Sequence, residues 1–306
     1  MDVPGFALVT GAASGIGKAC ATAFARDGAA GIALLDLSVS SLEAVRGEIE
    51  SNILKQQNGA NGTVKQHNGI NGSTKPQNGA ENGIVDQTNG TSHKSCRIEI
   101  YAVDVTDEEQ VKHAVNDAAT KFGRLDYVVN AAGIAIKHKG GAAFAETADW
   151  KRVLDINLSG TFFVQRAAAQ IMLKQDPILS SIDGRPLQRG SIVNFGSIQA
   201  VAGVSLSTAY TASKHAILGL TRSASEDYAK DGLRINAVCP GYTETPMTTK
   251  NPDVLKAMEE KVATAVPMQR MGMPSEIADG VLYLAGGRSS FVTGSALMVD
   301  GGYSSR

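Results

Sequence analysis

The chain has 306 residues, of which 43% are hydrophobic and 19% are charged, and its net charge is −1. This balance argues against an electrostatic surface for nucleic acid or anionic membranes, and no apolar run is long enough to predict a transmembrane helix. The N-terminal residues lack the basic segment and long apolar run of a signal peptide. Three dispersed cysteines without a CxxC motif predict neither disulfides nor a metal site. We therefore expect a reducing, cytoplasmic compartment.

The predicted elements alternate between short apolar strands and helices. In chain order they are strand 6–10, helix 16–27, strand 31–36, helix 42–50, strand 97–104, helix 108–122, strand 125–130, helix 150–174, strand 191–195, helix 209–230, strand 234–239, helix 274–285 and strand 296–299. Alternation of this kind predicts βαβ units with right-handed crossovers, and nearly continuous apolar strands indicate a sheet covered on both faces. We therefore predict an α/β fold, a Rossmann-type doubly wound parallel sheet of about seven strands, in a single domain over residues 1–306.

Residues 52–95 form a low-complexity insertion in this pattern. Asn-Gly occurs seven times in it, starting at positions 58, 61, 68, 71, 78, 82 and 89. Aromatic residues are absent and aliphatic residues are sparse, so the segment cannot bury enough apolar surface to offset the entropy of ordering it. We predict that the insertion is disordered. A tolerated surface insertion is the favoured interpretation, and a binding tether is the alternative.

A glycine-rich turn lies between the first strand and the first helix, with the spacing G-x-x-x-G-x-G from Gly11 to Gly17. Such a turn lets a diphosphate approach the backbone at a helix N-terminus, although glycines at a turn can also be structural. Asp36 closes the second strand, where a carboxylate can accept hydrogen bonds from both ribose hydroxyls and would repel a 2′-phosphate. Neither Ser14 nor Leu37 supplies a cation for that phosphate. The predicted cofactor is therefore NAD rather than NADP.

A second pattern predicts a proton-transfer centre. Tyr210 and Lys214 are four residues apart in a predicted helix, so both side chains lie on one face. A nearby ammonium stabilises tyrosinate and so lowers the tyrosine pKa. A cationic nicotinamide could lower this pKa further. Ser197 lies just past the fifth strand, at the edge of an open α/β sheet where ligands bind. Taken alone, the Tyr-Lys pair could be a solvated helix face and the serine a turn residue.

Together these motifs resemble the short-chain dehydrogenase/reductase family in its compact form, over nearly the whole chain outside the insertion. The matching segments are TGAASGIG at 10–17, Asp36, Asp104-Val105, NAAG at 130–133, Asn157, Ser197, Tyr210-x-x-x-Lys214 and PGYTETPM at 240–247. One small departure is Ala131, which replaces the second asparagine of the family's NNAG. We expect this replacement to be tolerated.

The resemblance implies a role for each matched residue. Tyr210 is the general acid/base, Lys214 binds the nicotinamide ribose and lowers the tyrosine pKa, and Ser197 holds the substrate oxygen. Asn157 positions a water that relays protons. Asp104 and Val105 contact the adenine, and Asn130 lies beside the adenosine ribose. The implied cofactor-binding residues are Gly11, Ser14, Gly15, Ile16, Gly17, Asp36, Asp104, Val105, Asn130, Tyr210, Lys214, Pro240, Gly241, Thr243 and Thr245.

The expected activity is hydride transfer between NAD(H) and a secondary alcohol or ketone. The substrate pocket should be lined by residues 134–146, 199–204 and 242–272, the last rich in methionine. This favours a medium-sized apolar small molecule, such as a specialised-metabolite intermediate, whereas Lys137 and His138 are expected in a solvated loop. The alternatives are an NADP-dependent ketoreductase, a scaffold repurposed for a non-redox reaction, and a non-catalytic family member. The resemblance also implies a homotetramer, with a dimer as second choice.

Overall fold

The computed structural model describes residues 3–60, 96–180 and 183–305. Its centre is a seven-stranded sheet in the order β3-β2-β1-β4-β7-β8-β9, in which every neighbouring pair is parallel. The strands are β1 (Phe6–Thr10), β2 (Gly31–Asp36), β3 (Arg97–Ala102), β4 (Tyr127–Asn130), β7 (Gly190–Phe195), β8 (Leu233–Pro240) and β9 (Ala296–Val299). The predicted doubly wound α/β fold is confirmed.

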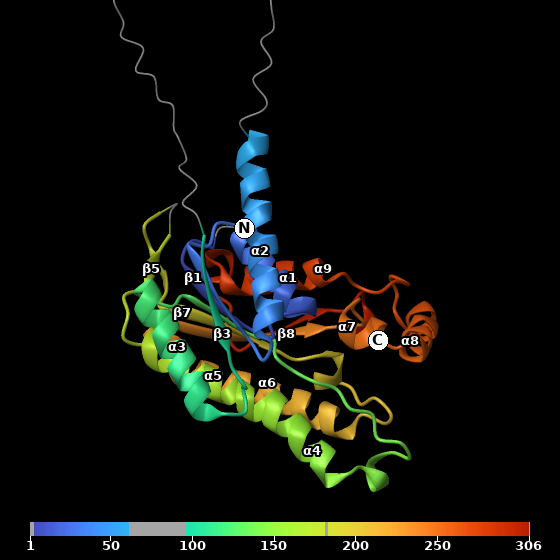
Figure 1. Ribbon diagram of the computed structural model, residues 1–306. Helices are drawn as coiled ribbons and strands as arrows, with labels where there is room; N and C mark the ends of the chain where they lie inside the picture. The colour runs from blue at the N-terminus through green and yellow to red at the C-terminus, as the bar shows by residue number, and fades with distance from the viewer. Residues whose placement is uncertain (1–2, 61–95, 181–182, 306) are drawn as a thin grey trace, which may run out of the picture.

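Helices cover both faces of the sheet (Figure 1). On one face lie α1 (Gly15–Arg26), α2 (Val39–Ala60) and α9 (Pro274–Ala285), and on the other lie α3 (Glu108–Phe122), α4 (Thr147–Leu154), α5 (Thr161–Met172) and α6 (Thr208–Tyr228). Successive strand residues point to opposite faces. Val9 therefore joins the core beneath α1 and α9, whereas its neighbour Leu8 joins the core beneath α3 and α5. This double burial explains why the strands are apolar at nearly every position.

The strand order changes direction between β1 and β4. The chain winds outward from β1 to β2 and β3, then returns to β4 and winds the other way. In open α/β sheets, ligands bind at the carboxyl ends of the strands beside such a switch point. The turns after Thr10, Asn130, Phe195 and Pro240 all begin at this carboxyl edge. The edge therefore collects the segments in which the sequence predicted function.

Several elements differ from the prediction. The long helix expected over 150–174 is divided into α4, a π-helical segment η2 (Asp155–Gly160) and α5. A short antiparallel pair, β5 (Ile178–Leu179) and β6 (Pro186–Gln188), precedes β7 and was missed. Two helices beyond the carboxyl end of β8, α7 (Pro246–Thr249) and α8 (Pro252–Ala265), were also missed (Figure 1).

The second helix, α2, ends later than predicted. It runs to Ala60 rather than to residue 50, and so includes the first residues of the predicted insertion 52–95. Residues 61–95, on which the rest of the disorder prediction falls, lie outside the described residues. Helix-compatible residues such as Ile53, Leu54 and Lys55 extend the helix past the point where the low-complexity composition begins.

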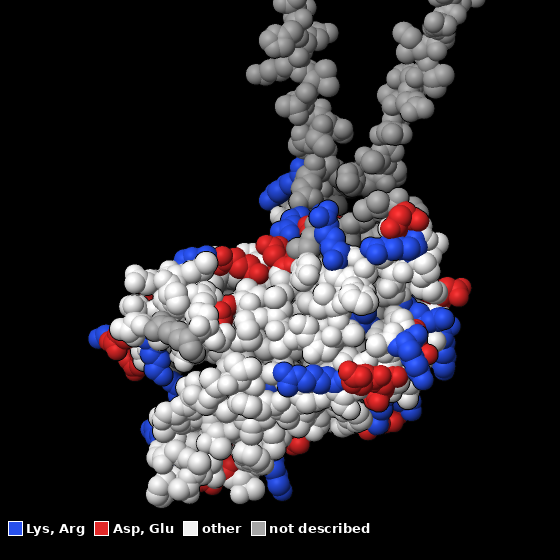
Figure 2. Space-filling view, turned by 180° about the vertical axis from the view of Figure 1, so that it is seen from behind, with Lys and Arg blue, Asp and Glu red and all other residues white. Residues whose placement is uncertain are grey.

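The molecular surface agrees with the balanced composition. On the face shown in Figure 2, basic and acidic side chains are interspersed, most of them along the margins and one adjacent pair of groups within the face. No helix within the described ranges is long and apolar enough to cross a membrane.

Candidate active site

The glycine-rich turn packs the first turn of α1 directly against the end of β1. A Cβ atom on Gly17 would lie 2.2 Å from the carbonyl oxygen of Gly11, so only glycine permits this approach. Gly11 and Gly15 have φ values of +65° and +53°, a region that favours glycine. Ser14, at the N-cap, makes no capping bond with its side chain, and the first turn of α1 carries no acidic residue. The N–H groups at this helix end are thus left for an external anion, as a diphosphate cradle requires.

Asp36 closes β2 beside this turn. Its Oδ2 accepts a hydrogen bond from the Ala13 N–H at 3.2 Å, and its Oδ1 accepts one from the Leu37 N–H at 2.8 Å. The Ala12 N–H also donates to the Leu35 carbonyl, at 3.1 Å. The carboxylate is therefore fixed against the cradle, where the sequence placed it.

Three further predicted cofactor residues lie on the neighbouring strands. Asp104 follows β3, and its Oδ1 accepts hydrogen bonds from the N–H and hydroxyl of Thr106 at 2.9 and 2.8 Å. Val105 packs against Gly160, on which a Cβ atom would lie 2.9 Å from the valine Cγ2. Asn130 turns its side chain inward, where its Nδ2 donates to Asn194 Oδ1 at 2.9 Å. This side-chain amide joins β4 to β7. If Asn130 contacts a ribose, the contact would therefore be made by its backbone atoms.

Ser197, Tyr210 and Lys214 come together at the carboxyl edge, between β7 and α6. Ser197 follows β7, and its Oγ accepts a hydrogen bond from the Gln199 N–H at 3.1 Å. The Ser197 side chain also lies close enough to the Tyr210 hydroxyl to lower the pKa of that hydroxyl. Lys214 Nζ lies 5.5 Å from the centre of the Tyr210 ring and donates to the Phe195 carbonyl at 2.7 Å. The three predicted side chains therefore lie near one another at this edge.

The electrostatics of this trio differ from the sequence expectation. Loss of solvent raises the pKa of Tyr210, and the nearby Ser197 side chain only partly opposes this. Burial lowers the pKa of Lys214 to about 8. The effect of Lys214 on the tyrosine pKa therefore stays a prediction for the complex with the cofactor, because in the protein alone desolvation dominates the pKa of Tyr210.

Asn157 lies in the π-helical segment η2, a kind of irregularity that often marks functional sites. Its Oδ1 accepts from the Ile134 N–H at 2.8 Å, and its Nδ2 donates to the Ile134 carbonyl at 2.9 Å and to Ser213 Oγ at 3.1 Å. The amide therefore joins the loop after β4 to α6. Since Oδ1 and Nδ2 of Asn157 both have hydrogen-bond partners, other atoms of η2 would have to position a water.

The turn after β8 faces the glycine-rich turn across the top of the sheet. A Cβ atom on Gly15 would lie 3.5 Å from Thr245 Cβ, although the two residues are 230 positions apart in the sequence. The Gly241 N–H donates to the Val299 carbonyl at 2.9 Å, and Thr243 Oγ1 donates to the Gly241 carbonyl at 3.1 Å. The predicted residues at 240–245 thus close the same crevice from the opposite side.

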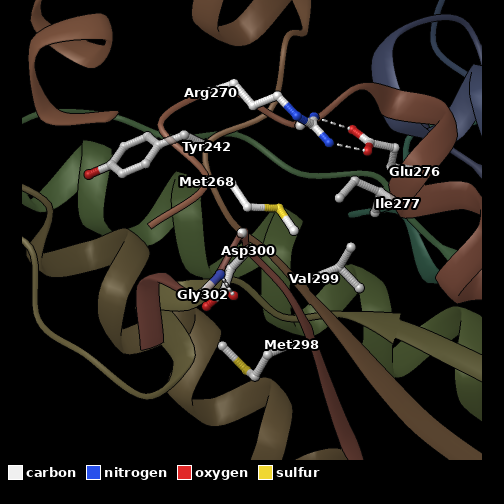
Figure 3. Close-up of a pocket in the computed structure, with 11 residues that line it drawn as sticks. Tyr242, Met268, Arg270, Glu276, Ile277, Met298, Val299, Asp300 and Gly302 are labelled. Atoms are coloured by element: carbon white, nitrogen blue, oxygen red, sulfur yellow. Dashed lines mark hydrogen bonds and ion pairs between the residues drawn. The ribbon is translucent and has the colours of Figure 1, made fainter. Parts of the chain in front are cut away.

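A cavity of about 320 Å³ lies beside this turn (Figure 3). Arg270 and Glu276 face each other across one side through a two-pronged ion pair of 2.6 and 2.8 Å. The lining residues are Tyr242, Met268, Arg270, Gly272, Glu276, Ile277, Met298, Val299, Asp300, Gly301 and Gly302. Segment 242–272 contributes to it, as expected of a pocket wall, but segments 134–146 and 199–204 do not. Ser197, Tyr210 and Lys214 are not among the residues that line this cavity.

Two residues near the site were misjudged or missed. His138 is only 3% exposed, so the prediction of a solvated histidine is wrong. The backbone N–H of His138 donates to the Leu206 carbonyl at 2.8 Å, and this hydrogen bond joins the loop after β4 to the loop before α6. Cys239, which no motif singled out, is fully buried, and a Cβ atom on Gly196 would lie 2.5 Å from its Sγ. The burial of Cys239 follows from the predicted strand 234–239, whereas nothing in the local sequence signals the burial of His138, which depends on a contact with a distant loop.

Comparison with known proteins gives consistent matches over the chain. Residues 5–77 match the family model described as short chain dehydrogenase, and residues 77–304 match the one described as Enoyl-(Acyl carrier protein) reductase. The chain is 36% identical to the short-chain dehydrogenase srdC of Neurospora crassa, covering 99% of this chain and 97% of that protein. It is 33% identical to the 3-oxoacyl-[acyl-carrier-protein] reductase FabG of Thermotoga maritima, covering 96% of each. The crystal structure of levodione reductase superposes with a TM-score of 0.76 at 27% identity, covering 98% of this chain and 97% of that one.

Proposed function

Because the chain belongs to the short-chain dehydrogenase/reductase family, we propose that it transfers a hydride between NAD and a secondary alcohol or the corresponding ketone. The observation that carries this proposal is the grouping of Ser197, Tyr210 and Lys214 at the sheet edge from which the glycine-rich turn also starts. Such a reaction needs a proton donor, a hydroxyl that binds the substrate oxygen and a site for the cofactor diphosphate. Tyr210, Ser197 and the glycine-rich turn would supply these at one sheet edge.

The residues at the crevice fit a dinucleotide. The uncapped end of α1 and the close approach of Gly17 suit a diphosphate, and the Asp36 carboxylate suits two ribose hydroxyls. A 2′-phosphate would meet that negative charge, which favours NAD over NADP. When bound, the nicotinamide supplies the site that accepts or gives up the hydride. Thr243 and Thr245 would hold its carboxamide, as the resemblance implies.

The chain's own residues account for proton movement. Ser197 would hold the substrate oxygen next to the Tyr210 hydroxyl, whose pKa its side chain already influences. With its raised pKa, Tyr210 is protonated at neutral pH and is therefore suited to donate its proton to the oxygen formed when a ketone is reduced. In the oxidative direction Tyr210 must accept the proton of the alcohol and so must first be deprotonated. A positive charge near its hydroxyl would stabilise this tyrosinate. Lys214 is the side chain placed to supply it.

We propose a medium-sized apolar substrate, for which a specialised-metabolite intermediate is one source. Exposed apolar side chains stand in the segments that follow three adjacent strands: Phe144 (72% exposed) after β4, Val201 (51%) after β7 and Met247 (53%), in α7, after β8. Such side chains gain by covering an apolar ligand and offer little to a sugar. The relatives named above include a 3-oxoacyl reductase and a levodione reductase, both named for carbonyl substrates.

Two other candidates are weaker. An NADP-dependent ketoreductase would have to accommodate the phosphate beside Asp36, and a non-redox function would leave an intact Ser-Tyr-Lys trio unused. As the resemblance implies, we propose a homotetramer, and light scattering that gives a monomer at micromolar concentration would contradict it. The cytoplasmic location stays a prediction.

The test is nicotinamide absorbance during incubation with a panel of secondary alcohols and ketones, using NAD(H) and NADP(H) in parallel. Turnover with NAD(H) of at least one apolar substrate is the expected result. Tyr210→Phe should lower kcat by about 10²–10⁴-fold while leaving NAD affinity and melting temperature unchanged. Near-normal turnover by this variant would contradict the assignment of Tyr210.

A further inference from the structure

Leu206 adopts a backbone conformation that leucine normally avoids. It lies in the loop that joins Ser197 to Tyr210, nine residues after the serine and four before the tyrosine. Its φ is +64°, in the left-handed region where a Cβ atom crowds the following carbonyl. Gln269 is the other non-glycine residue with positive φ among the described residues. A specific contact must therefore maintain the turn at Leu206.

That contact is a hydrogen bond between two loops at the carboxyl edge. The His138 N–H, in the loop after β4, donates to the Leu206 carbonyl at 2.8 Å. The same loop is held at its start by Asn157, whose amide pairs with both backbone groups of Ile134. The loop after β4 is thus fixed at one end by Asn157 of η2 and at the other by the turn that precedes Tyr210.

Both partners in this contact carry a local cost. The His138 ring is 3% exposed, and its Nε2 has no hydrogen-bond partner among the described residues. A buried polar atom without a partner is unfavourable, as is a left-handed leucine. Costs of this kind gather at functional sites, where the surrounding structure holds a conformation that local preference opposes.

The turn leaves the Leu206 side chain 40% exposed rather than buried in the core. Core packing alone therefore does not explain the strained turn. The exposed apolar side chains of Phe144 and Val201 belong to the same two loops, and Met247 follows the next strand, β8. The four side chains share the sheet edge that carries Ser197 and Tyr210.

We propose that Leu206 is a specificity-determining residue, held in its left-handed turn by His138 so that its side chain contacts the apolar part of the substrate beside Tyr210. The proposal rests on the proposed function and deepens it. It identifies the substrate as a ketone or secondary alcohol that carries a bulky apolar group next to the reacting carbon.

The experiment compares two methyl ketones, benzylacetone and butanone, with NADH. Leu206→Gly removes the side chain and suits the left-handed turn, and Leu206→Asn keeps the turn but makes the side chain polar. Each variant should lower kcat/KM for benzylacetone about tenfold or more, equivalent to about 1.4 kcal/mol, while butanone changes less than about twofold. The melting temperature of Leu206→Gly should not fall, because glycine relieves the strain.

The matched control is Leu179→Gly. Leu179 is 60% exposed, but it lies in β5, before β7 and far from α7 and α8 (Figure 1). This variant should leave the ratio of kcat/KM values for the two ketones unchanged. An unchanged ratio in both Leu206 variants overturns the proposal, as does an equal loss for both ketones, which would show a purely structural turn. If the unmodified protein turns over neither ketone, the proposed function fails for this class. The inference is then decided by calorimetry, in which Leu206→Asn must raise the Kd for benzylacetone about tenfold.

Discussion

Replacing Gly17 by alanine should damage the cofactor cradle. The added Cβ atom would lie 2.2 Å from the Gly11 carbonyl oxygen and 2.7 Å from its carbon, and both of these are backbone atoms that no rotamer change can move. An ordinary carbon–oxygen contact is about 3.3 Å, so α1 and the turn must separate by about 1 Å. Overpacking of this kind costs about 1–3 kcal/mol, which predicts a fall in melting temperature of about 2–10 °C.

The same displacement moves the N–H groups that would hold the diphosphate. We therefore expect the Kd for NAD, measured by calorimetry, to rise at least about tenfold in Gly17→Ala. The matched control is Gly219→Ala in α6, where a Cβ atom would meet nothing within 4 Å. Because alanine is the better helix former by about 0.8–1 kcal/mol, this control should melt higher and bind NAD normally. A Gly17→Ala protein that matches the unmodified chain in both Kd and melting temperature would refute the reasoning.

Three further predictions concern the cofactor, the buried lysine and the insertion. Asp36→Ser combined with Leu37→Arg removes the carboxylate and adds a cation, so the NADP-to-NAD ratio of kcat/KM should rise at least about tenfold in steady-state kinetics; an unchanged ratio would place specificity elsewhere. Burial lowers the pKa of Lys214 to about 8, below its value in the unfolded chain. At a pH between these two pKa values, Lys214 therefore holds a proton in the unfolded chain but not in the folded protein. The stability of the unmodified protein relative to Lys214→Met should therefore increase as pH rises from about 8 to 10.5 in denaturant titrations, and a flat difference would contradict the burial argument. Replacing residues 61–93 by a short Gly-Ser linker should preserve turnover, NAD affinity and melting temperature, because loop closure costs only about 0.6 kcal/mol per doubling of length; loss of activity in a folded deletion variant would reveal a functional segment.

The sequence alone determined the features that depend on local pattern. Apolar runs located all seven strands of the main sheet, because a strand buried on both faces has almost no polar positions. The i, i+4 spacing placed Tyr210 and Lys214 on one helix face, and Ser197 was found because it follows a strand. Local signals for α8 were also present, since Asn251 caps that helix through the Asp253 N–H at 3.0 Å and Pro252 follows. Leu255, Met258 and Val262 also recur at helical spacing and pack together, so the local sequence carried a signal for α8 that the prediction did not include.

Tertiary structure decided the features that depend on pairs of distant segments. The approach of Gly15 to Thr245, the burial of His138 beneath Leu206 and the use of the Asn157 amide by Ile134 each join residues far apart in the chain. The direction of a pKa shift also depends on the tertiary structure. A motif shows that a lysine stands near a tyrosine, but the shift also depends on how much solvent the assembled fold removes from both groups, and here that loss raises the pKa of Tyr210 and lowers that of Lys214.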